Sequence, residues 1–220
     1  MKSNLIVPTL VGVMTAITIS TLAVNASAEA ILLSTLIEND GTITNGDKEF
    51  SDFGYAATGD MPSSDRVNVL TIEDAEGNFG IRFQGGFVDL PGDGASDALI
   101  FYDVTVTDEA NSISGAHLAA NIVSPENSSG TITETFLPIF DSTDEILRIP
   151  TNDSRLNDSI TFPETVQTMQ VQKNILFIAA EGEQVDMSFV DQTFAQVPEP
   201  SGLAILLLLG SASACIWLRR

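Results

Sequence analysis

The chain has 220 residues and is strongly acidic, with 30 aspartates and glutamates against 9 lysines and arginines. All the acids lie between Glu29 and Glu199, whereas Lys2, Arg219 and Arg220 lie outside that span and leave six bases within it. Because this acidic middle could not neutralise phosphates, the composition excludes nucleic acid as a partner. The single cysteine lies near the C-terminus, so the middle has neither a disulfide framework nor a cysteine-rich metal cluster.

The first 28 residues have the features of a secretory signal peptide. Lys2 supplies the positive charge, a mostly apolar stretch covers residues 5–24, and Ala26-Ser27-Ala28 offers the small residues that signal peptidase requires. We therefore expect cleavage directly after this tripeptide and export of the remainder. A retained membrane anchor is the alternative, but Pro8 and several threonines weaken the stretch as a permanent span.

Residues 29–196 are predicted to form one acidic all-β domain. Apolar and polar residues alternate in short segments, most clearly over Leu99–Thr107, where every second residue from Ile100 is large and apolar. Period two with β-branched residues indicates strands, and similar segments lie at 67–71, 79–83, 131–136 and 185–189. Many short strands separated by turn residues favour a single antiparallel β-sandwich over alternating βα units.

Three stretches of the middle are expected to differ from regular strands. Gly85-Gly86 is typical of a turn, and Thr151–Ser159 is rich enough in Asn, Asp and Ser to be the longest loop. Residues 31–38 could begin a helix, although their Ser, Thr and β-branched residues oppose it.

The C-terminal segment, residues 197–220, has three parts in a fixed order. Pro198-Glu199-Pro200 is stiff and extended, because proline refuses a helix and restricts the residue before it. An uncharged apolar run, Gly202–Leu218, would reach roughly 25 Å as a helix, close to a hydrocarbon core of ~30 Å. Arg219-Arg220 ends the chain and is expected on the cytoplasmic side.

This order resembles the PEP-CTERM sorting signal of Gram-negative bacteria. The resemblance implies that an exosortase, a membrane-embedded cysteine protease, processes the exported protein near Pro198-Glu199-Pro200. It also implies that the apolar helix holds the protein transiently in the inner membrane, and that the mature protein reaches the cell surface or an extracellular matrix of polysaccharide. A plain C-terminal anchor with a proline-rich spacer is the alternative.

An acidic loop offers a candidate metal site. Asp89, Asp93 and Asp97 place three carboxylates in a segment rich in Gly and Pro, and Ca²⁺ accepts such flexible oxygen ligands. The spacing does not match an EF-hand loop, so a solvated acidic turn is the favoured alternative. If calcium does bind, this loop is where we expect it.

No residue set in the middle indicates catalysis. The only histidine, His117, stands among small and apolar residues, no Gly-x-Ser-x-Gly motif accompanies it, and a zinc site lacks further histidines or cysteines. With 30 acids, a pair of carboxylates suited to a glycosidase would arise by chance. We therefore predict a non-catalytic surface or matrix protein. The alternatives are a calcium-dependent module that binds extracellular polysaccharide and, with less support, a polysaccharide-active enzyme.

Overall fold

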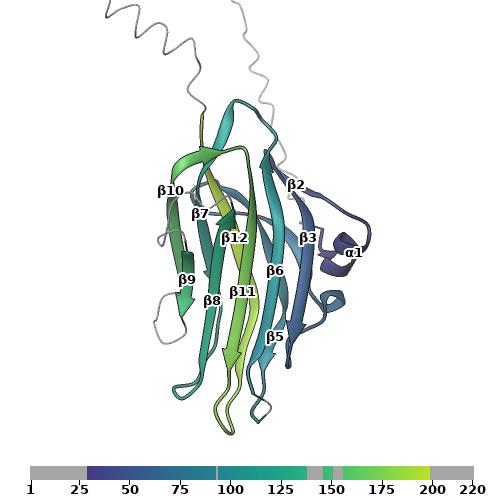
Figure 1. Cartoon of the computed structure of the whole chain (residues 1–220), viewed down its shortest axis with the longest axis vertical. Coiled ribbons are helices and arrows are strands. Elements are labelled where there is room, and N and C mark those ends of the chain that lie inside the picture. The colour runs from purple at the N-terminus through teal and green to yellow at the C-terminus, as the bar shows by residue number, and fades with distance from the viewer. Residues whose placement is uncertain (1–28, 93, 138–145, 151–155, 199–220) are drawn as a thin grey trace, which may run out of the picture.

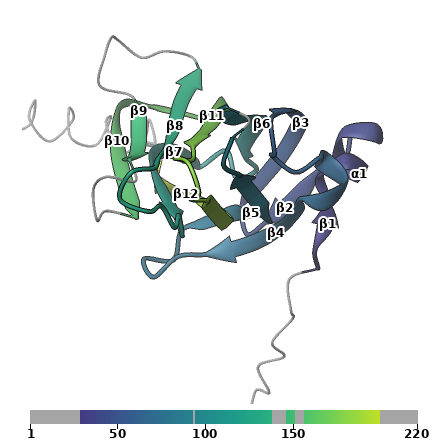
Figure 2. The same cartoon turned by 90° about the horizontal axis from the view of Figure 1, so that it is seen from below.

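Two six-stranded antiparallel sheets pack face to face and form a β-sandwich. The computed structural model describes residues 29–92, 94–137, 146–150 and 156–198. The sandwich predicted from the alternating pattern is confirmed, and the two layers are seen end-on in Figure 2.

The first sheet, sheet A, has the strand order β1-β4-β5-β12-β7-β10. Its strands are β1 (Ile31–Leu32), β4 (Asn68–Glu73), β5 (Phe79–Asp89), β12 (Val185–Pro198), β7 (Asn111–Ala120) and β10 (Asn157–Val166).

The second sheet, sheet B, has the order β2-β3-β6-β11-β8-β9. Its strands are β2 (Ile43–Asn45), β3 (Lys48–Thr58), β6 (Ser96–Val106), β11 (Thr168–Ile178), β8 (Ser129–Leu137) and β9 (Ile146–Pro150). The chain crosses between the sheets several times, for example from β6 to β7 and from β11 to β12, as Figure 1 shows.

The core lies between the sheets and follows the period-two pattern. On β6, Ile100, Tyr102 and Val104 are fully buried, and the residues between them face outward. The ring of Tyr102 packs against Phe83 of sheet A with centroids 5.6 Å apart, and against Phe50 of sheet B at 6.1 Å. Each such side chain stabilises the fold by about 1.5–3 kcal/mol through burial alone, so these rings hold the two layers together.

Some local predictions were wrong. Gly85-Gly86 lies inside β5 rather than in a turn, where the register with β12 shifts between Met187 and Phe189. Glycine within a strand often marks such a bulge, because the pairing is locally disrupted there. The end of the predicted loop at 151–159 is also strand, since β10 begins at Asn157.

The short helix α1 (Leu33–Glu38) does form. It is accompanied by one 3₁₀ turn, η1 (Ser64–Arg66). Leu33 and Leu36 are buried and belong to the core cluster, so tertiary packing outweighs the weak helix propensity.

Most of the two terminal segments lies outside the described residues. This applies to the predicted signal peptide with Ala26 and Ala28, to Glu199 and Pro200, and to the apolar run with Arg219-Arg220. Pro198 is described as the last residue of β12, where it stands opposite Asn111 of β7. Among the described residues, no helix has the length and apolar character needed to cross a membrane.

Candidate functional site

The outward face of sheet A carries two rows of side chains that cross β5, β12, β7 and β10. The pairing registers align Arg82, Asp191, Ala119 and Asn157 in one row. The next row on the same face aligns Gly80, Thr193, His117 and Ser159. Residues on alternate positions of each strand point to the same face, so these rows form one continuous surface.

An ion pair spans the first row. The guanidinium of Arg82 donates from two nitrogens to the two carboxylate oxygens of Asp191, over 2.6 and 2.7 Å. The guanidinium also lies over the ring of Phe189, 4.0 Å from its centroid. The hydrogen bond that Arg82 donates to Asp191 outweighs the effect of burial and raises the pKa of Arg82. The two hydrogen bonds therefore fix the orientation of the guanidinium, which carries a positive charge.

Asp74 lies in the turn between β4 and β5 and contacts Thr193 of the second row. Its Oδ1 accepts the backbone N–H groups of Glu76 and Asn78, at 3.0 and 2.9 Å. Its Oδ2 accepts the side-chain amide of Asn78 at 2.9 Å and the hydroxyl of Thr193 at 2.6 Å. Burial raises the pKa of Asp74, but these hydrogen bonds together lower it to about 2. Asp74 is therefore a carboxylate at neutral pH, and it attaches the turn to β12.

His117 stands beside this carboxylate on β7. Its Nδ1 lies 3.2 Å from Asp74 Oδ2, and its side chain is 36% exposed. The imidazole lies on the outward face of sheet A and is half-buried there. Its neighbours on β7, Ala116 and Leu118, are buried, and they are the apolar residues that flank His117 in the sequence.

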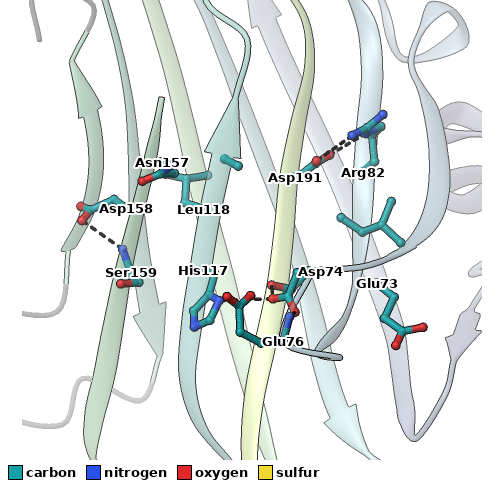
Figure 3. Close-up of a pocket in the computed structure, with 13 residues that line it drawn as sticks. Glu73, Asp74, Glu76, Arg82, His117, Leu118, Asn157, Asp158, Ser159 and Asp191 are labelled. Atoms are coloured by element: carbon teal, nitrogen blue, oxygen red, sulfur yellow. Dashed lines mark hydrogen bonds and ion pairs between the residues drawn. The ribbon is translucent and has the colours of Figure 1, made fainter. Parts of the chain in front are cut away.

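Together the two rows line a depression of about 520 Å³ (Figure 3). Its polar residues are Glu73, Asp74, Glu76, Arg82, His117, Asn157, Asp158, Ser159, Asp191 and Thr193. Figure 3 shows the side chains of Asp74, Glu76 and His117 gathered at one place, with the Arg82–Asp191 pair beside them. The surface therefore combines carboxylate, guanidinium, imidazole, amide and hydroxyl groups in an open site.

A metal ion is one conceivable occupant. Ligand atoms of Asp74, Glu76 and His117 lie within 4.8 Å of one another, and the two partners of the histidine are carboxylates. Both oxygens of Asp74 already accept hydrogen bonds from protein groups, however, and an ion would have to compete with them. The set is better suited to holding His117 and the turn in place.

A hydrolytic relay is a second conceivable use. Ser159 stands opposite His117 in the β7–β10 pairing, so Asp74, His117 and Ser159 follow the order of a Ser-His-Asp relay. Among the described residues, no hydrogen bond joins Ser159 to His117, and the N–H of Ser159 bonds to Asp158 at 3.0 Å.

The predicted calcium loop lies elsewhere, at the turn between β5 and β6. Asp89 is buried and accepts hydrogen bonds from the Ser96 hydroxyl and the Ala179 N–H, each at 2.5 Å. Asp97 accepts the side-chain amide of Asn174 at 2.8 Å, and Asp93 lies outside the described residues. Calcium binding at this loop stays a prediction.

The sequence matches no protein-family model and no curated protein. The solved structures that match this chain at a distance include the following two. The carbohydrate-binding module TmCBM61, solved in complex with β-1,4-galactotriose, is 10% identical over 66% of this chain and 88% of its own, with a TM-score of 0.31. The enzymatically active domain of bacteriophage CBA120 tailspike protein 4 is 13% identical over 66% of this chain and 19% of its own, with a TM-score of 0.28. Both TM-scores are too low to bear on function.

Proposed function

We propose that this chain is an exported, non-catalytic β-sandwich module that binds a neutral polysaccharide in the outer depression of sheet A. The observation that carries the proposal is the polar lining of that depression, which comes from β4, β5, β12, β7 and β10 and from the turn before β5. Sugar hydroxyls both donate and accept hydrogen bonds. The guanidinium of Arg82, the amide of Asn157 and the carboxylates beside them offer matching partners.

The charge of the depression selects among polysaccharides. Its lining has five carboxylates, from Glu73, Asp74, Glu76, Asp158 and Asp191, whereas Arg82 is its only lysine or arginine. Arg82 is also already paired with Asp191. An anionic polysaccharide would meet like charge here, so the proposal specifies a neutral one. Since His117 is the only aromatic ring in the lining, binding rests on hydrogen bonds more than on stacking, and we expect it to be weak for a single site.

Export and processing belong to the same proposal. Signal peptidase acts after Ala28, and an exosortase acts near Pro198-Glu199-Pro200 before the domain reaches the cell surface or matrix. The sequence order of Pro198-Glu199-Pro200, an apolar run and a terminal arginine pair supports this proposal. Mass spectrometry of surface-fraction protein tests it. A mature protein that keeps residues 202–218 would contradict processing and leave a plain anchor.

Affinity electrophoresis tests the binding site. The protein is run through gels that contain dextran, galactan, glucomannan or a uronic-acid polysaccharide, and we expect retardation by at least one neutral polymer. His117→Ala and Asn157→Ala should each weaken the retardation. The matched control is Gln172→Ala on the outward face of sheet B, which should leave it unchanged. Equal loss in all three variants, or binding of the uronic-acid polymer alone, would contradict the site.

The proposal that the domain is non-catalytic is tested with the same polymers. We expect no release of reducing ends from any of them. Steady release that Ser159→Ala or Glu76→Gln abolishes would make the depression an active site and would contradict this part of the proposal.

A further inference from the structure

Three polar side chains meet in the space between the two sheets. Lys173 of β11 and Glu134 of β8 stand opposite each other in sheet B, and Gln192 of β12 reaches them from sheet A. All three are 0% exposed. Burying an amine, a carboxyl and a carboxamide together is unfavourable unless their hydrogen bonds are complete.

The hydrogen bonds of this trio are incomplete. Lys173 Nζ contacts Glu134 Oε1, and it lies 3.2 Å from Gln192 Oε1. Among the described residues, Gln192 Nε2 and Glu134 Oε2 are buried and have no hydrogen-bond partner. Buried polar atoms nearly always find a partner, so these two require an explanation.

The amine is also chemically unusual. Burial lowers the pKa of Lys173 well below its ordinary value, and the charge of Asp191 opposes this shift only in part. A neutral lysine amine has a free lone pair and is a nucleophile. The carboxamide of Gln192 approaches this amine from the other sheet, and the carboxyl of Glu134 is in contact with the same nitrogen.

We propose that Lys173 and Gln192 become joined by an intramolecular isopeptide bond, with Glu134 carrying the protons. Lys173 Nζ attacks Gln192 Cδ with its lone pair, and the carboxylic acid of Glu134 gives its proton to Oε1. The carboxylate then takes a proton from Nζ and passes it to Nε2. The Cδ–Nε2 bond breaks, ammonia leaves with the bonding pair, and the proton on Oε1 returns to Glu134. The products are a secondary amide and ammonia, with no oxidant or reductant.

The isopeptide bond would reduce the number of buried polar atoms in the trio that lack a hydrogen-bond partner. The unpartnered Nε2 departs as ammonia, and the new amide N–H can donate to Glu134. It would also tie β11 of one sheet to β12 of the other, which constrains the unfolded chain as a disulfide does. The middle of this chain has no cysteine with which to make such a tie.

A second lysine provides the matched control. Lys48 Nζ lies 2.7 Å from Asp47 Oδ1 and also contacts Gln196 Oε1, so its partners are again an acid and a glutamine. Gln196 is exposed, however, and water can solvate both its carboxamide and any charge beside it. Of these two lysines, only Lys173 has an acid and a glutamine that are both fully buried beside it.

Mass spectrometry of the denatured full-length protein tests the bond. A protease that cuts after Glu181 and Glu183 separates Lys173 from Gln192, so only a cross-link keeps the two fragments together. We expect a joined fragment that is lighter by one ammonia in the wild type and in Lys48→Met. We expect separate fragments in Lys173→Met and in Glu134→Gln, whose carboxamide cannot carry the proton.

The wild-type result is decisive even if a variant fails to fold. Separate, unmodified fragments from the folded wild type would overturn the proposal, as would a loss of ammonia that persists in Lys173→Met. A fragment lighter by one water that joins Lys173 to Glu134 would overturn the choice of Gln192 as acceptor.

Discussion

Arg82 and Asp191 face each other across β5 and β12, and the same guanidinium that forms two hydrogen bonds with this carboxylate also covers the ring of Phe189. One side chain therefore joins an ion pair to an aromatic contact on the outward face of sheet A. The side chain of Arg82 is 33% exposed and that of Asp191 is 18% exposed, so water screens the pair only in part.

Arg82→Lys should be destabilising although it keeps the charge. Lysine loses the second hydrogen bond and the planar stack on Phe189, and we expect the free energy of unfolding to fall by about 1 kcal/mol. Urea unfolding measures this. Arg66→Lys, on the exposed turn η1, is the control and should change the free energy by less than about 0.5 kcal/mol. If Arg82→Lys and Arg66→Lys changed the free energy of unfolding equally, the geometry of the Arg82–Asp191 pair would not contribute to stability.

Asp74 should make a distinct contribution to acid unfolding. Its pKa in the folded protein is about 2, against an ordinary value of 3.8, because its hydrogen bonds outweigh burial. The charged form therefore stabilises the fold, fully above the unfolded pKa and progressively less as the pH falls through about 2.

Asp74→Asn measures that contribution. The variant should be less stable than the wild type at neutral pH, and the difference should shrink as the pH is lowered from about 5 to about 2. Urea unfolding of both proteins across this range gives the difference directly. A difference that stays constant with pH would mean that the charge of Asp74 does not contribute.

Removal of the hydroxyl should destabilise the protein at Tyr55 but not at Tyr102. The Tyr55 hydroxyl donates to the Pro62 carbonyl over 2.6 Å, so Tyr55→Phe should lower the free energy of unfolding by about 1 kcal/mol. The Tyr102 hydroxyl is buried and has no hydrogen-bond partner among the described residues. Tyr102→Phe should therefore be neutral or stabilising by up to about 1 kcal/mol. Thermal and urea unfolding of the matched pair measure this, and a destabilised Tyr102→Phe would contradict it.

Cations should stabilise this domain mainly by screening. Only six bases lie among the acids of the middle, so most carboxylates repel one another over a Debye length of ~8–10 Å. We expect NaCl to raise the melting temperature and MgCl2 and CaCl2 to raise it alike, in the wild type and in Asp93→Ala. A rise specific to calcium that Asp93→Ala abolishes would instead establish the loop of Asp89, Asp93 and Asp97 as a calcium site. No response to any salt would contradict the screening argument.

The strands could be predicted from the sequence because buried apolar residues alternate with outward residues along each one. Ile100, Tyr102 and Val104 alternate with outward residues on β6, and Ile81 and Phe83 do so on β5. This alternation is visible within the sequence of a single strand, so it can be detected without knowing which strands pair. The wrong prediction of a turn at Gly85-Gly86 falls where the register between β5 and β12 shifts, and the sequence of one strand does not show its register with another.

By itself, then, the sequence determined the all-β class, the inward face of the main strands and the absence of disulfides from the middle, because each depends on composition or local period. Only the tertiary structure decided which polar residues meet. Asp74 reaches His117 because a turn folds over β12, and Lys173 reaches Gln192 because the two sheets close on each other. Strand order and register bring these residues together, and they are set by packing over the whole domain rather than by the residues nearby.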